Sequence, residues 1–185
     1  MSIIMKKLNI LFILLLGVLS LKSQAQCNLP YKPLSAFGTD TTAFIIYNFM
    51  DRKDCYKDKT IKEVLKDLNL PVKHDVKFLS PRGSFFTGVT IYIYDRNTVI
   101  KLWDNEKDDN AIDIYWEKEI NRLDPQYEKV RRSDWDKGFY DYIKDMKIKE
   151  INVPIPSYSK YYEKYRPKEL KSQDNNPYKR NKSDW

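Results

Sequence analysis

Residues 88–95, Gly-Val-Thr-Ile-Tyr-Ile-Tyr-Asp, contain the clearest structural pattern in the chain. Aliphatic side chains occupy every second position, and threonine or tyrosine occupies the positions between them. Successive side chains of a β-strand point to opposite faces, so this alternation predicts a strand with one buried and one exposed face. The aliphatic set is Val89, Ile91 and Ile93, and the polar set is Thr90, Tyr92 and Tyr94.

Residues 111–120 repeat the alternation further along the chain. The apolar set is Ile112, Ile114, Trp116 and Ile120, and the polar set is Asp113, Tyr115, Glu117 and Glu119. If the two strands are neighbours, three tyrosines and three acids share one face of the sheet, here called the polar face. We expect the helices on the Ile/Trp side, because helices on the polar face would bury the acids without partners.

Three helices are predicted around these strands. Residues 43–50 form an apolar segment that follows Thr39-Asp40-Thr41, which offers N-cap chemistry. Thr60-Ile61-Lys62-Glu63 fits the capping box, in which the threonine and glutamate side chains each bind a backbone N–H at the helix start. A third helix, with an aromatic buried side, is expected to begin at Ser133.

Shorter segments predict further strands at residues 76–79, 98–103 and 148–153, with a turn at Ser80-Pro81-Arg82-Gly83. The short connections favour antiparallel pairing, and the order of elements favours a sheet covered on one side. The sequence therefore predicts an α+β fold. It is a two-layer sandwich in which a mostly antiparallel sheet of about four to five strands has about three helices packed on one face.

The first 25 residues have the pattern of a secretory signal peptide. Lys6 and Lys7 precede an apolar run at residues 10–21, and Ser23-Gln24-Ala25 supplies the small residues of a cleavage site. The run would span about 18 Å as a helix, less than a hydrocarbon core of about 30 Å. We therefore expect residues 1–25 to be removed. The mature protein, without a transmembrane helix, is expected to be exported by a bacterial cell and to be periplasmic or secreted.

Cys27 and Cys55 are the two cysteines of the sequence. An even pair in an exported protein predicts one disulfide, which would fix the mature N-terminus to the end of the first helix. Cys27 also follows the apolar run closely, as a lipid-acceptor cysteine does. Such a site normally has Gly, Ala or Ser before its cysteine, whereas Gln26 stands here. Lipid anchoring through Cys27 is therefore the less favoured alternative.

The net charge of +7 is unevenly distributed. Residues 27–159 carry 22 basic and 22 acidic groups, whereas residues 160–185 carry eight basic and four acidic groups. A nucleic-acid-binding domain is expected to have a basic face on the fold itself, so the neutral body argues against nucleic acid as a partner. We expect residues 26–158 to form a single α+β domain. Residues 159–185 are expected to form a basic, tyrosine-containing, largely disordered tail.

The sequence contains no recognisable catalytic motif. His74 is the only histidine, and the glycines form no phosphate- or nucleotide-binding motif, so we assign no catalytic residue, no metal site and no cofactor. Glu117 and Glu119 lie roughly 6.5–7 Å apart on one face of the predicted strand, which fits a two-carboxylate hydrolase. That spacing is also common in exposed strands without any function.

Two functions remain open. The first is recognition, without catalysis, of a protein or glycan of the cell envelope or extracellular space, through the tyrosine-rich polar face and the basic tail. Its candidate residues are Tyr92, Tyr94, Tyr115, Glu117 and Glu119. The second is a carboxylate-dependent hydrolase of polysaccharide or peptidoglycan that uses Glu117 or Glu119 as acid or base. Tyrosine and threonine are favoured on any half-exposed strand, so an ordinary sheet surface is the alternative to both.

Overall fold

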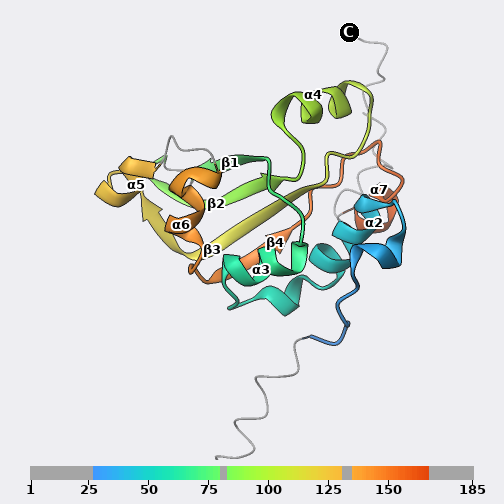
Figure 1. The fold of residues 1–185 in the computed structure, drawn as a ribbon, viewed down its shortest axis with the longest axis horizontal. Helices are drawn as coiled ribbons and strands as arrows, with labels where there is room; N and C mark the ends of the chain where they lie inside the picture. The colour runs from blue at the N-terminus through green and yellow to red at the C-terminus, as the bar shows by residue number, and fades with distance from the viewer. Residues whose placement is uncertain (1–26, 80–82, 131–134, 167–185) are drawn as a thin grey trace, which may run out of the picture.

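The computed structural model describes residues 27–79, 83–130 and 135–166. Within them the chain forms one four-stranded antiparallel sheet, whose strands lie side by side in the order of the sequence (Figure 1). The strands are β1 (His74–Leu79), β2 (Phe85–Tyr92), β3 (Ala111–Asn121) and β4 (Ile148–Asn152). The predicted α+β fold with an antiparallel sheet is confirmed.

Most helical segments of the described chain pack on one face of this sheet (Figure 1). They are η2 (Leu34–Phe37), α2 (Thr41–Ile45), η3 (Ile46–Asp51), η4 (Lys53–Tyr56), α3 (Ile61–Leu68), α4 (Arg96–Asp104), α5 (Pro125–Val130), η5 (Trp135–Phe139), α6 (Tyr140–Ile143) and α7 (Tyr162–Tyr165). The first predicted helix is present as α2 and η3, and the third as η5 and α6. The predicted signal peptide, residues 80–82 of the predicted turn, Ser133 and the predicted tail beyond Arg166 lie outside the described residues.

The predicted strand at residues 98–103 is wrong, because these residues belong to helix α4. Asp95 caps this helix: its carboxylate accepts hydrogen bonds from the backbone N–H and the hydroxyl of Thr98, at 3.0 and 2.7 Å. Val99 of α4 packs in one small apolar cluster with Tyr92 and Ala111. α4 therefore covers one end of the polar face, which the sequence predicts to be free of helices.

The main core lies on the opposite face of the sheet, as the alternation predicts. β2 and β3 are neighbours, and their register pairs Val89 with Ile114 and Ile91 with Ile112. All four side chains are almost completely buried, together with Trp116 on β3. Burial of one such aliphatic side chain stabilises the fold by roughly 1.5–3 kcal/mol, so these two strands supply much of its hydrophobic stabilisation.

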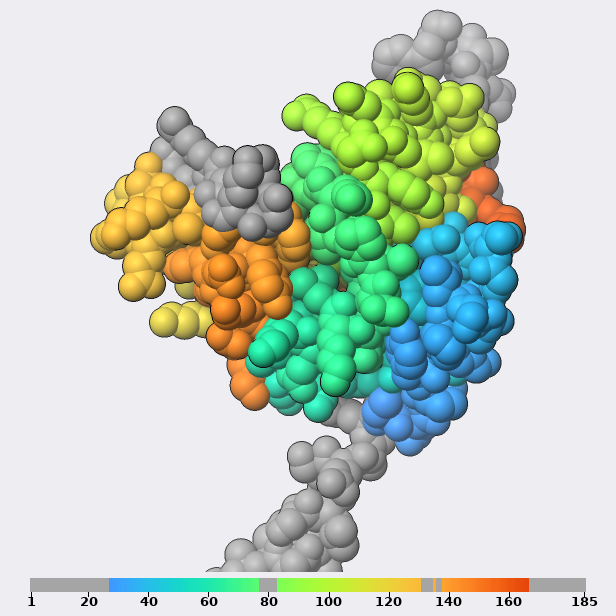
Figure 2. All heavy atoms as spheres, viewed as in Figure 1, coloured from blue at the N-terminus to red at the C-terminus, as the bar shows by residue number. Residues whose placement is uncertain are grey.

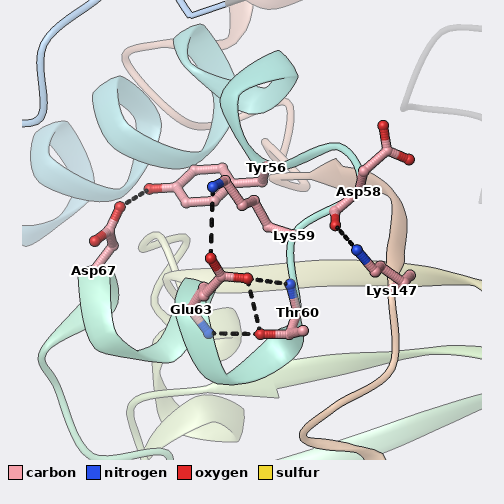
Figure 3. Close-up of polar contacts among 7 residues, drawn as sticks. All are labelled: Tyr56, Asp58, Lys59, Thr60, Glu63, Asp67 and Lys147. Carbon is pink, nitrogen blue, oxygen red and sulfur yellow. Dashed lines mark hydrogen bonds and ion pairs between the residues drawn. The ribbon is translucent and has the colours of Figure 1, made fainter. Parts of the chain in front are cut away.

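Helix α3 begins with the predicted capping box (Figure 3). The carboxylate of Glu63 accepts the backbone N–H of Thr60 at 2.7 Å, and the Thr60 hydroxyl accepts the backbone N–H of Glu63 at 3.3 Å. Lys59 forms an ion pair with the same carboxylate at 3.5 Å. The helix ends at Asn69, which has a left-handed φ of 48°. Its buried residues are Ile61, Val64 and Leu68.

Cys27 and Cys55 form a disulfide, as the sequence predicts, so the sulfur of Cys27 is not free to carry a lipid. Arg52, which precedes Cys55 closely in the sequence, is a buried arginine. Its guanidinium donates to the carbonyl oxygen of Leu29 at 2.9 Å and to the hydroxyl of Tyr56 at 3.1 Å. The disulfide and the arginine together hold the N-terminal segment against the helical layer.

Candidate functional site

Tyr92, a predicted binding residue, is 8% exposed and does not lie on an open surface. It belongs to one small apolar cluster with Val99 of α4 and Ala111, and the ring of His74, its neighbour on β1, stacks on it with 5.5 Å between the ring centroids. Burial, together with the charges of Asp109 and Asp113, raises the pKa of Tyr92 to about 12. The expected open tyrosine face is thus closed at this end by the helix that the sequence did not predict.

Tyr115, Glu117 and Glu119 lie further along β3, where they face away from the core. Tyr115 is half-buried, and the strand register places it between Gly88 on β2 and Glu150 on β4. Glu117 and Glu119 are exposed. These side chains share a strand, but none of them lines the open groove beside Tyr94 that is described below.

Asp113 is the half-buried acid of the polar face. The hydroxyl of Thr90, directly opposite on β2, donates to its carboxylate at 2.8 Å. Burial raises the pKa of Asp113 above its ordinary value, the Thr90 hydrogen bond acts against this shift, and the charge of Asp109 adds to it. The Asp113 carboxylate in the middle of the polar face therefore already has a hydrogen-bond partner within the protein.

Tyr94 lines an open groove of about 580 Å³ at the end of the sheet where α4 lies. Three separate parts of the chain form its walls: residues 39–42 at the start of α2, residues between 102 and 110 at and after the end of α4, and residues 158–160. Figure 2 shows the α4 region in yellow-green above the N-terminal region in blue, with an orange-red segment at their junction. Elements distant in the sequence therefore meet here.

Asp109 and Asn110 connect the groove to β3, and both are buried. The carboxylate of Asp109 accepts the indole N–H of Trp103 at 2.8 Å and the backbone N–H of Ala111 at 3.3 Å. The carboxamide of Asn110, which lines the groove, donates to the hydroxyl of Tyr94 at 3.4 Å. Its Oδ1 has no hydrogen-bond partner among the described residues.

Asp40 fixes the opposite rim of the groove. One carboxylate oxygen accepts the backbone N–H of Ala43 at 2.8 Å, and the other accepts Lys160 Nζ at 2.7 Å and the hydroxyl of Tyr161 at 3.0 Å. The hydrogen bond from Lys160 is the main reason that the pKa of Asp40 lies below its usual value, and the bonds from Ala43 and Tyr161 act in the same direction. The rim therefore joins residues 120 positions apart.

Tyr158 presents an aromatic ring next to several carboxylates. It lines the groove and is 37% exposed. Partial burial raises the pKa of its hydroxyl, and the negative charges of Asp109, Asp108 and Glu106 raise it further. The exposed ring therefore lies in an acidic environment.

The lining of the groove is suited to binding. Leu102 is the one aliphatic side chain among the thirteen described residues that line it, and the others are tyrosines, hydroxyl residues, acids, lysines and Asn110. They include no histidine and no cysteine. No group of three or more His, Cys, Asp or Glu side chains in the described ranges is placed to hold a metal ion. The groove offers ring faces, hydrogen-bond acceptors and hydrogen-bond donors.

Of the predicted binding residues, only Tyr94 lines the groove. Asn110, Tyr158 and Lys160 were not predicted as part of a site with it, because they reach it from loops whose positions depend on the whole fold. Two features of the sequence analysis lie at the groove. One was the N-cap chemistry around Asp40, and the other was the basic, tyrosine-containing tail predicted to begin at residue 159.

Comparisons with known proteins add no functional assignment. The sequence matches no protein-family model, and no curated protein or solved structure is significantly similar to it. Among the helices of the described residues, none combines the length and the apolar character that crossing a membrane requires.

Proposed function

We propose that this chain is an exported bacterial protein that binds, without transforming it, a glycan of the cell envelope or extracellular space. The groove is the binding site, and the basic residues near the C-terminus add attraction to anionic envelope material. The observation that carries the proposal is the combination of Tyr94 and Tyr158 with the carboxylates of Glu106 and Asp108 in one open groove.

A sugar ring has an apolar C–H face and a polar edge of hydroxyl groups. The rings of Tyr94 and Tyr158 supply flat apolar area, and their hydroxyls supply hydrogen bonds. Ionised carboxylates such as Glu106 and Asp108 accept hydrogen bonds from sugar hydroxyls, and these charge-assisted bonds are stronger than neutral ones. An apolar peptide side chain would find only Leu102 as an aliphatic partner, so the lining favours a glycan over an apolar peptide.

The test is binding of the processed, exported protein to a glycan array, followed by titration with the best ligand. Tyr158→Ala should weaken binding roughly fivefold to thirtyfold, because it removes an exposed aromatic contact worth about 1–2 kcal/mol. Tyr31→Ala is the matched control, since Tyr31 is equally exposed at 37% but lies on the N-terminal segment outside the groove. No glycan binding, or equal loss in both variants, would contradict the proposal.

The hydrolase remains the second candidate from the sequence, with Glu117 or Glu119 as acid or base. Both side chains are exposed and lie outside the groove. The same titration separates the two functions when the recovered ligand is analysed for new reducing ends. An intact ligand supports binding without reaction, whereas cleavage that Glu117→Gln or Glu119→Gln abolishes would establish the hydrolase.

A further inference from the structure

Asn110 carries an unsatisfied polar group at the groove. It is 7% exposed, and its Oδ1 has no hydrogen-bond partner among the described residues. Buried polar groups are almost always paired, because an unpaired one loses its bonds to water without replacement. Among the described residues, its carboxamide makes one long hydrogen bond of 3.4 Å, in which Nδ2 donates to the Tyr94 hydroxyl. The carboxamide therefore has an acceptor oxygen that no described residue uses.

The backbone at Asn110 favours this residue type. Its φ of 56° lies in the left-handed region, which asparagine, aspartate and glycine adopt most readily. The neighbouring Asp109 is held by Trp103 and by the backbone N–H of Ala111, so the segment before β3 is fixed on both sides. The carboxamide is thus presented by a segment that is hydrogen-bonded on both sides.

We infer that the groove recognises a glycan with an acetamido substituent, whose amide pairs with the carboxamide of Asn110. This inference rests on the proposed glycan-binding function. An amide N–H is the donor that the unpaired Oδ1 requires, and an amide also carries a carbonyl acceptor for the carboxamide NH₂. Because Asn110 is buried, its partner must project from the sugar ring. An acetamido group projects further than a ring hydroxyl.

The acetamido methyl and the sugar ring have partners in the same groove. Tyr94 is the residue that holds the Asn110 carboxamide, and its half-buried ring is the adjacent apolar surface. Tyr158 offers the second exposed ring, and Glu106 and Asp108 offer acceptors for the remaining hydroxyls. Recognition of the amide at Asn110 and of the ring at the tyrosines thus fits one ligand.

The test compares two tetrasaccharides that differ only at this substituent. Tetra-N-acetylchitotetraose, here called chitotetraose, has 2-acetamido groups where cellotetraose has 2-hydroxyls, and both have the same β-1,4 backbone. Calorimetric titration of the processed protein should show at least tenfold tighter binding of chitotetraose. Asn110→Gly keeps the left-handed backbone accessible and removes the carboxamide, so it should abolish this preference, with the larger loss of affinity falling on chitotetraose.

Asn110→Asp is the second variant, since it keeps an acceptor oxygen and a residue that tolerates left-handed φ. It should retain part of the preference for chitotetraose. Equal affinity of the wild-type protein for both sugars, or an equal loss for both sugars in Asn110→Gly, would overturn the inference while glycan binding stands. Failure to bind any glycan on the array would instead overturn the proposed function itself.

Discussion

Asp113 shows how burial changes the chemistry of one side chain on the polar face. Its pKa in the folded protein is raised above the ordinary value because the carboxylate is partly buried. The folded state therefore binds the proton more tightly than the unfolded state does. It follows that Asp113 favours the fold below its unfolded pKa of about 3.9, and that this contribution is lost as the pH rises through the folded pKa.

Replacing Asp113 by asparagine should stabilise the protein at pH 7. Asp113→Asn removes the buried charge and keeps an oxygen that accepts the hydroxyl of Thr90, which now donates at 2.8 Å. We expect a higher urea midpoint at pH 7, and the advantage should disappear below about pH 4, where aspartate itself is protonated. Glu150→Gln, an exposed acid on neighbouring β4, should change little. A gain that is independent of pH would contradict the role assigned to burial.

At the scale of elements, α4 differs from the other helices because it packs on the polar face, where its buried residue is Val99. Trp103, although 48% exposed, is fixed through its indole N–H to Asp109. α3 instead buries three aliphatic residues in the main core. Few buried contacts mean a low free energy of local opening, so α4 should open before α3.

Val99→Ala should loosen α4 selectively. The lost methyl groups are expected to cost about 2 kcal/mol, between the values typical of Ile→Val and Ile→Ala. Hydrogen exchange should become faster in residues 96–104 and stay unchanged in residues 61–68. Ile100→Ala is the matched control on the same helix, because Ile100 is 41% exposed and buries little. Equal acceleration in both helices would show that α4 does not open as a separate unit.

Local patterns explain which elements could be predicted. The alternations in residues 88–95 and 111–120 and the capping box at Thr60 depend on near neighbours. The structure has the capping box and both strands, although β2 ends at Tyr92 and not at Asp95. The segment at 98–103 contains adjacent β-branched residues that also suit a strand. Its helical state depends on the cap at Asp95, which is a local signal, and on packing against β2, which no local pattern contains.

The groove was less predictable than the sheet for the same reason. Tyr94 was selected from its place in the alternation, but the side chains around it come from three parts of the chain. The bond between Asp40 and Lys160 spans 120 positions, and no periodicity links such residues. The burial of Tyr92 likewise depends on where α4 packs.

At the scale of the whole molecule, both ends of the described chain are tied to η3. Near the N-terminus, Asn48 of η3 accepts the backbone N–H of Lys32 at 3.2 Å and donates to its carbonyl at 2.9 Å. Near the C-terminal end, the hydroxyl of Tyr165 donates to Asp51 at 2.8 Å. The Cys27–Cys55 disulfide is thus one of several constraints on the N-terminal segment.

Removing the disulfide should lower global stability without releasing that segment. The bond joins residues 28 positions apart, and loop-closure entropy gives a loss of about 3–4 kcal/mol for Cys27→Ser/Cys55→Ser. Because Asn48 still binds the backbone of Lys32, the amide of Lys32 should remain protected from hydrogen exchange under native conditions. Asn48→Ala with the disulfide intact should show the reverse, with a smaller global loss and faster exchange at Lys32. If Lys32 exchanges freely once the cysteines are replaced, then the covalent bond alone positions the segment, and the contacts of η3 merely follow it.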